Sequence, residues 1–241
     1  MKRNATSIHW FRQDLRLSDN PALNASAKNG KVIPIYILDT KNTTERPVGG
    51  AGRVWLHHSL KSLNDSLNGA LRCFKGDPLE ILERLIAEVK PQSITWNRLY
   101  DASSIARDRN IKTKLGETGL TVLSFGGSLL WEPWETLKAD GTPYKVFTPF
   151  YRRGCLNASP PRSPEPSPSI KFVKNDSKDE TRIDDLNLLT KTCWERSIIN
   201  DWRVGELGAK ERLTEFIKNE IADYREAVSY THLTLPTKRI V

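Results

Sequence analysis

One short stretch of the sequence groups charged residues in a pattern that could serve a binding site. Arg12, Asp14 and Arg16 alternate directly after residues 7–11, an apolar run with the composition of a β-strand. We expect them to form a tight charged turn at the carboxyl end of that strand. The same three side chains can also pair as an Arg–Asp–Arg salt bridge that holds the turn, and we favour this interpretation because such pairs are mostly structural.

The other residue types that often carry chemistry show no comparable grouping. The four histidines lack the spacing of metal ligands, and His9 is expected to pack within its strand rather than to bind a ligand. The three cysteines are far apart and odd in number, which favours neither a disulfide framework nor a zinc site and suits a reducing cytoplasm. The remaining residues of these two sets are His57, His58, His232, Cys73, Cys155 and Cys193.

The charge of the chain is concentrated in its first half. The formal net charge is +8, and residues 1–130 carry 19 Lys and Arg against 12 Asp and Glu. A basic surface favours a polyanionic partner such as nucleic acid, although many proteins without such a partner are equally basic. No apolar run approaches the ~18 residues of a membrane span, and the N-terminus has no apolar signal region, so we expect no membrane contact.

The hydrophobic pattern alternates between strands and helices. Amphipathic helical segments separate the β-rich runs, with Asn20 and Pro21 starting the first helix and Asp77 and Pro78 starting the third. Strict alternation of strand and helix predicts an α/β fold with a doubly wound, five-stranded parallel sheet. The expected strands are residues 7–11, 32–38, 71–74, 93–96 and 120–125, and the expected helices begin at residue 21 and cover 53–69, 78–89 and 103–118.

The composition divides the chain into four parts. Residues 1–130 form the α/β domain, and residues 131–200 form a linker that is rich in Pro and Ser between 158 and 168. Residues 201–227 begin a helical domain, which contains a helix at about 205–224. Residues 228–241 interrupt that charged helix with a β-prone string, so we interpret them as a non-native tail, with an ordinary frayed C-terminus as the alternative.

Five motifs in order resemble the photolyase/cryptochrome family, most nearly a class I-like deoxyribodipyrimidine photolyase. The most specific is HWFRQDLRLSDNPAL over residues 9–23, where the family has W-F-R-x-D-L-R followed by D-N-x-A-L. The others are IARD at 105–108, LLWEP at 129–133, GTPYKVFTPF at 141–150 and a W-x-x-G-E-x-x-A-x-x-R-L-x-x-F pattern from Trp202 to Phe216. The resemblance spans residues 7–227 and is weakest in the linker.

This resemblance implies a light-driven activity. Family members repair cyclobutane pyrimidine dimers in DNA by electron transfer from excited, reduced FAD to a flipped-out lesion. The flavin is held by a helical domain, while the α/β domain holds an antenna pigment. Because the cofactor carries the chemistry, we expect no catalytic nucleophile or acid–base pair. The resemblance stops between Ala227 and Val228, so we interpret the chain as an N-terminal fragment that is inactive in repair by itself.

The resemblance also assigns candidate cofactor contacts. Tyr224 stands at the family position of the first FAD contact. The antenna is expected outside the carboxyl ends of the strands, where ligands bind in open α/β sheets. Folate-binding relatives carry an Asn-Glu pair where this chain has Ser103 and Ser104, so a folate, a deazaflavin, a flavin and an empty pocket all remain open. The expected antenna cleft comprises Phe11, Arg12, Leu38, Asp39, Asp101, Ser103 and Ser104, and ordinary turn chemistry is the alternative for them.

Two other functions remain open at this stage. A cryptochrome-type blue-light photoreceptor would share the same front half, because nothing before residue 227 separates it from a photolyase. A free-standing α/β nucleotide-binding module would need residues 131–227 to be dispensable. We favour a monomeric photolyase whose partner is DNA containing pyrimidine dimers.

Overall fold

The computed structural model describes residues 5–41, 48–173, 180–189 and 199–222, together with residues 194, 196 and 224. The predicted non-native tail, residues 228–241, and the Ala227/Val228 boundary lie outside these ranges. His232 and Cys193 lie outside them as well.

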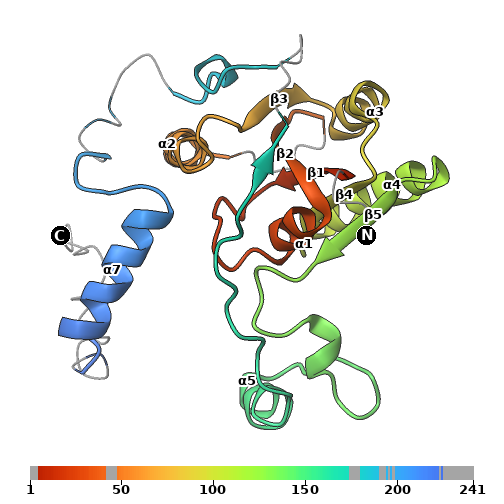
Figure 1. Cartoon of the computed structure of the whole chain (residues 1–241). Helices are drawn as coiled ribbons and strands as arrows, with labels where there is room; N and C mark the ends of the chain where they lie inside the picture. The colour runs from red at the N-terminus through yellow and green to blue at the C-terminus, as the bar shows by residue number, and fades with distance from the viewer. Residues whose placement is uncertain are drawn as a thin grey trace.

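A twisted parallel sheet forms the centre of the molecule (Figure 1). Its strands follow the spatial order β3-β2-β1-β4-β5, and every pairing between them is parallel. The chain first winds outward from β1 through β2 to β3 and then reverses to β4 and β5, which confirms the predicted doubly wound α/β fold. The strands are β1 (Ala5–Phe11), β2 (Gly30–Asp39), β3 (Arg72–Gly76), β4 (Ser93–Asn97) and β5 (Thr121–Phe125).

Four helices cover the two faces of the sheet. One apolar cluster joins α1 and α2 to one face, and a second cluster joins α3 and α4 to the other. Helices α1 and α3 start where the sequence predicts, because side-chain caps satisfy their first N–H groups: Asn20 accepts from Leu23 N–H, and Asp77 accepts from Leu79 N–H. Helix α2 starts three residues before its predicted start and has no side-chain cap. These helices are α1 (Pro21–Asn29), α2 (Gly50–Ser66), α3 (Pro78–Val89) and α4 (Ala102–Glu117).

A buried polar row runs between β1 and β4 beneath α1. The hydroxyls of Ser7 and Ser93 lie 2.8 Å apart, and His9 Nδ1 lies 2.9 Å from the Thr95 hydroxyl, which also contacts Ser26. Burial lowers the pKa of His9 to about 4, so its ring is neutral near pH 7. His9 is therefore packed within its strand, as the sequence predicts.

The turn after β1 differs from its prediction. Arg12 pairs with Asp108 of α4, and Arg16 pairs with Asp19, so neither arginine forms an ion pair with Asp14. The Asp14 carboxylate instead accepts from the backbone N–H of Arg12 (3.0 Å) and from the side-chain amide of Asn97 (2.5 Å). The expected Arg–Asp–Arg salt bridge is wrong because neutral donors occupy Asp14 and each arginine reaches another carboxylate.

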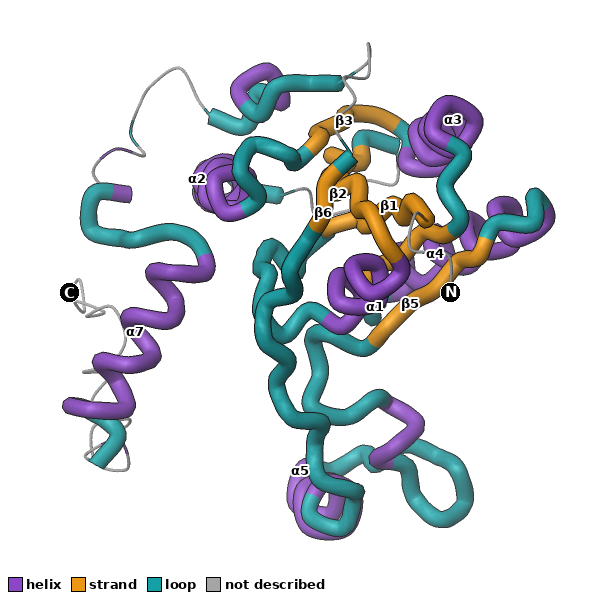
Figure 2. Tube along the Cα trace, in the orientation of Figure 1, coloured by secondary structure: helices purple, strands orange, loops and turns teal. Residues whose placement is uncertain are grey.

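The segment after β5 leaves the sheet and later returns to it (Figure 2). It first forms short helical turns, η1 (Pro133–Thr136), α5 (Phe147–Pro149) and η2 (Phe150–Cys155), and then runs without regular structure over residues 159–170. A two-residue strand, β6 (Lys171–Phe172), pairs with β2, and η3 (Asp184–Leu186) follows. Phe172, Leu186 and Leu188 pack in the α1/α2 cluster, so part of the predicted linker contributes to the core of the α/β fold.

The last described helix, α7 (Glu206–Asn219), lies beside the sheet domain, on the side of α2 (Figure 1). Its start matches the helix predicted at about residue 205. Gly208 is its one buried residue.

Candidate functional site

Four charged side chains meet at the carboxyl ends of β1 and β2. Arg12 follows β1, Asp39 is the last residue of β2, and Arg107 and Asp108 project from the first turns of α4. Arg107 bridges the group, with its guanidinium 3.3 Å from Asp39 Oδ2 and 2.9 Å from Asp108 Oδ1, while Asp108 Oδ2 pairs with Arg12. We call these four residues the strand-end cluster. It lies at the switch point of the sheet, between β1 and β4, where open α/β sheets bind ligands.

Two indole rings support the strand-end cluster. The guanidinium carbons of Arg12 and Arg107 lie 5.2 Å and 5.3 Å from the ring centre of Trp10, within the range of a cation–π contact. Trp10 in turn meets Trp96 edge to face at 5.8 Å. Both rings are buried, so the cluster rests on a rigid apolar floor.

Arg12 keeps unused hydrogen-bonding capacity within this cluster. Its side chain is only 4% exposed, yet Nε and Nη2 have no hydrogen-bond partner in the described part of the chain. Burial lowers the pKa of Arg12, and the neighbouring Asp108 carboxylate opposes that effect. A buried guanidinium whose Nε and Nη2 lack partners can hold an anionic or carbonyl oxygen of a ligand.

The other predicted antenna residues do not join this group. Phe11 and Leu38 project to the opposite face, where they pack with the α1/α2 cluster. Asp101 caps α4 by accepting from the Ser104 N–H and the Ser103 hydroxyl, both in the same turn. Burial acts to raise the pKa of Asp101, but these hydrogen bonds outweigh it and lower the pKa to about 2. The turn interpretation therefore accounts for Asp101, Ser103 and Ser104.

A pocket of about 250 Å³ opens next to the strand-end cluster. Its lining includes Trp96 of β4 and four residues of α4, which are Ile105, Asp108, Arg109 and Lys112. Pockets for drug-sized ligands usually enclose ~300–1,000 Å³, so this one suits part of a ligand rather than a whole pigment.

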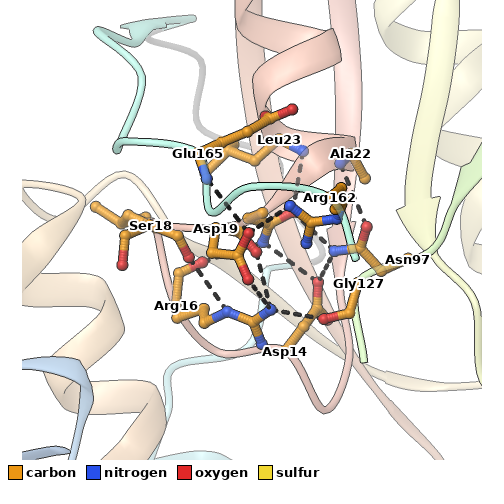
Figure 3. Close-up of polar contacts among 12 residues, drawn as sticks. Asp14, Arg16, Ser18, Asp19, Ala22, Leu23, Asn97, Gly127, Arg162 and Glu165 are labelled. Carbon is orange, nitrogen blue, oxygen red and sulfur yellow. Dashed lines mark hydrogen bonds and ion pairs between the residues drawn. The ribbon is translucent and has the colours of Figure 1, made fainter. Parts of the chain in front are cut away.

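The loop between β1 and α1 gathers polar contacts from distant parts of the chain (Figure 3). The Asp14 carboxylate accepts a hydrogen bond from the side-chain amide of Asn97 in β4, and the Arg16 guanidinium donates to the carbonyl oxygen of Gly127, after β5. Asp19, whose φ of 50° is left-handed, donates its N–H to Glu165 O (2.7 Å) and pairs with Arg162. This loop, residues 14–20, is the middle of the motif with the strongest family resemblance. Its contacts connect β4, the segment after β5 and residues 162–165, so they serve the structure.

A larger cavity of about 580 Å³ lies between α2 and the residues that lead into α7. Its charged lining residues are mostly neutralised: Lys61 pairs with Asp184 at 2.9 Å, and Arg203 pairs with Glu211. Next to it, Trp202 meets Trp55 of α2 edge to face at 5.7 Å. The cavity marks the contact between the α/β domain and the start of α7.

Tyr224 is the one described candidate for an FAD contact. Its side chain is 48% exposed and packs edge to face on Phe216 at 5.7 Å. Among the described residues no second cofactor contact lies beside it, so they do not build a flavin pocket. The described residues also contain no group of three or more His, Cys, Asp or Glu side chains that could hold a metal ion. No helix in the described ranges is long and apolar enough to cross a membrane.

Sequence reasoning missed three residues that the structure makes prominent. Arg107 and Asp108 belong to the IARD string, which marked only a helix start, although an adjacent pair of opposite charges near the start of the helix after β4 was the available signal. Glu206 belongs to the W-x-x-G-E string, and nothing in the sequence shows that it reaches back to residues 17 and 18.

Known proteins resemble this chain in both sequence and structure. The family model described as DNA photolyase matches residues 7–169. A deoxyribodipyrimidine photo-lyase of Agrobacterium fabrum is 40% identical over 228 residues, which cover 93% of this chain and 47% of the relative. Cryptochrome-2 of Arabidopsis thaliana is 31% identical over 233 residues, which cover 93% of this chain and 38% of the relative.

The structural comparison agrees. The crystal structure of a bacterial class III photolyase from Agrobacterium tumefaciens superposes with a TM-score of 0.85 at 38% identity, covering 94% of this chain and 47% of that protein. The chain thus spans about half the length of that photolyase, or less in the case of the cryptochrome. By its sequence match and its fold, the chain belongs to the DNA photolyase family.

Proposed function

We propose that this chain is the pigment-binding front part of a light-dependent flavoprotein that repairs cyclobutane pyrimidine dimers in DNA. Membership of the DNA photolyase family supports this proposal, as does the 40% identity to a deoxyribodipyrimidine photo-lyase. The observation that carries it is the strand-end cluster, in which Arg12 is buried at the switch point and its Nε and Nη2 have no hydrogen-bond partner among the described residues.

The residues of the cluster fit an antenna pigment that presents a carbonyl or carboxylate oxygen. Arg12 would bind that oxygen through Nε and Nη2, while Asp108 and Asp39 hold Arg12 and Arg107 in place. Folates, deazaflavins and flavins all carry such oxygens, so the cluster is compatible with each of them. When bound, the pigment would supply light absorption, and the protein would supply its position and the exclusion of water.

FAD is the proposed cofactor of the whole repair protein, and Tyr224 is its candidate contact in this chain. Tyr224 is half exposed and has no neighbouring cofactor contact among the described residues, so we derive no step of the flavin reaction from them. The proposed partner is DNA with pyrimidine dimers, for which the net charge of +8 is favourable. We further propose a monomer in the cytoplasm, where the free thiols of Cys73 and Cys155 would stay reduced.

Pigment titration tests the proposed antenna site. The purified chain is mixed with a methenyl-folate, a deazaflavin or FMN, and binding is followed by pigment fluorescence. We expect one of them to bind, and Arg12→Lys to weaken that binding by at least about tenfold, because lysine keeps the charge beside Asp108 but loses the planar donor pair. Arg53→Lys, at an exposed position of α2 on the other face of the sheet, makes the same charge-conserving change and is the control. Binding that Arg12→Lys leaves unchanged would remove the cluster from the site.

A cryptochrome-type photoreceptor is the second candidate, favoured by the 31% identity to cryptochrome-2. The two functions predict different behaviour of the gene product that continues the family pattern beyond residue 227. Illumination of that protein with dimer-containing DNA should restore intact pyrimidines if it is a photolyase. Flavin photoreduction without any loss of dimers would favour the photoreceptor instead.

A further inference from the structure

Helix α7 is attached to the α/β domain almost entirely through its first turn. Of its 14 residues only Gly208 is buried, and the apolar side chains farther along remain exposed, with Leu213 at 57% and Ile217 at 52%. An isolated helix of this length is marginal in water. The contacts around residues 202–206 must therefore hold α7 in position.

The Glu206 carboxylate makes the most extensive of these contacts. Its Oε2 accepts from the backbone N–H of Leu17 (2.7 Å), and its Oε1 accepts from the backbone N–H of Ser18 (3.2 Å) and from the Ser18 hydroxyl. Lys210, one turn along α7, pairs with the same Oε1 at 2.6 Å. The side chain is only 15% exposed, so these charge-assisted bonds are partly shielded from water.

The residue before it brings the two elements close together. Gly205 has a φ of 109°, and a Cβ at this position would lie 2.0 Å from Ser62 Oγ on α2. Only glycine allows both this backbone conformation and this approach. Together with the contact between Trp202 and Trp55, Gly205 holds residues 202–205 against α2. The next residue, Glu206, then reaches the β1–α1 loop with its side chain.

We propose that Glu206 is a positioning residue that docks the start of the helical region onto the β1–α1 loop. The loop presents two consecutive backbone N–H groups and one hydroxyl, a set of three donors that matches the two oxygens of a carboxylate. Glutamine cannot replace it fully, because one end of its amide is a donor and would face the Ser18 or Leu17 N–H. Glu206 thereby sets the orientation of α7 relative to the sheet, and this docking does not depend on which pigment or cofactor the protein carries.

Hydrogen–deuterium exchange of the 241-residue chain tests the docking role. In Glu206→Gln we expect the amides of α7 and of residues 17 and 18 to exchange at least about tenfold faster, as the loss of charge-assisted hydrogen bonds predicts. The amides of β1 and β4 should keep their wild-type protection, because the sheet does not need α7. Glu215→Gln, which removes the same charge from an exposed site on α7, should behave as wild type.

A second variant displaces α7 without changing the Glu206 side chain, so it tests whether faster exchange follows from undocking itself. Gly205→Ala should increase α7 exchange in the same way, since its methyl group displaces the helix from Ser62 while leaving the Glu206 carboxylate intact. Unchanged exchange in α7 and at residues 17–18 of Glu206→Gln would overturn the proposal. Equal loss of protection in α7 and the sheet would also overturn it, because Glu206 would then support global stability rather than docking.

Discussion

Removing the Asp108 carboxylate should destabilise the fold strongly, because it leaves the buried Arg12 cation without its ion-pair partner. The two side chains are 4% and 14% exposed, so little water can replace the lost partner. Breaking a buried pair of this kind typically costs about 3–5 kcal/mol. The contact of Arg12 with the Trp10 ring persists in the variant and favours the lower end of this energy range. We therefore expect Asp108→Asn to lose about 3 kcal/mol of unfolding free energy.

Urea unfolding measures this loss directly, as a lower midpoint at an unchanged slope. A melting temperature lower by about 6–12 °C should accompany it in a chain of this size. The control is Asp184→Asn, which breaks the exposed pair with Lys61 and should cost under about 1 kcal/mol.

The double variant Arg12→Met/Asp108→Leu distinguishes an ion-pair effect from a packing effect. It removes both charges, so it should be more stable than Asp108→Asn. A loss below about 1 kcal/mol in Asp108→Asn, or a double variant as unstable as the sum of its single variants, would refute the reasoning.

Three further predictions concern the polar residues around the sheet. Burial holds the pKa of His9 near 4, below its unfolded value near 6.5, so the unfolded chain binds a proton at a higher pH than the folded chain does. The unfolding free energy should therefore fall as the pH drops from about 6.5 to 4. His9→Asn should flatten a plot of unfolding free energy against pH in that window. Asp101→Ala removes the cap of α4 and should cost about 1 kcal/mol in urea unfolding, whereas Asp101→Asn should cost less. Asn97→Leu removes the amide that donates to Asp14 at 2.5 Å and should cost about 1–3 kcal/mol in the same measurement; an unaffected midpoint would show that water replaces the amide.

The sequence contains enough local information to predict the sheet and its helices. The caps at Asn20 and Asp77 and the apolar runs of the strands act within a few residues, and the structure uses each of them as predicted. The alternation of strands and helices then leaves few topologies other than a doubly wound parallel sheet.

The candidate site was only partly predictable, because its geometry depends on contacts between distant residues. Strand ends are readable from sequence, which places Arg12 and Asp39 at two of them, but a strand-end position does not reveal which face a side chain occupies. Phe11 and Leu38 were included for their position and lie on the opposite face. The partner of Arg12 is 96 residues away, and no local pattern predicts that pair.

The return of the chain to the sheet has a further consequence for the segment that leaves it. Residues 126–161 depart after β5 and are held at the far end by the pairing of Arg162 and Glu165 with Asp19 and by β6 beside β2. They therefore form a long loop whose two ends are both fixed to the α/β sheet. A single peptide-bond cleavage near the exposed residues 139–142 would open this loop without separating the fragments. The two pieces would remain a non-covalent complex under native conditions and part only when the sheet unfolds.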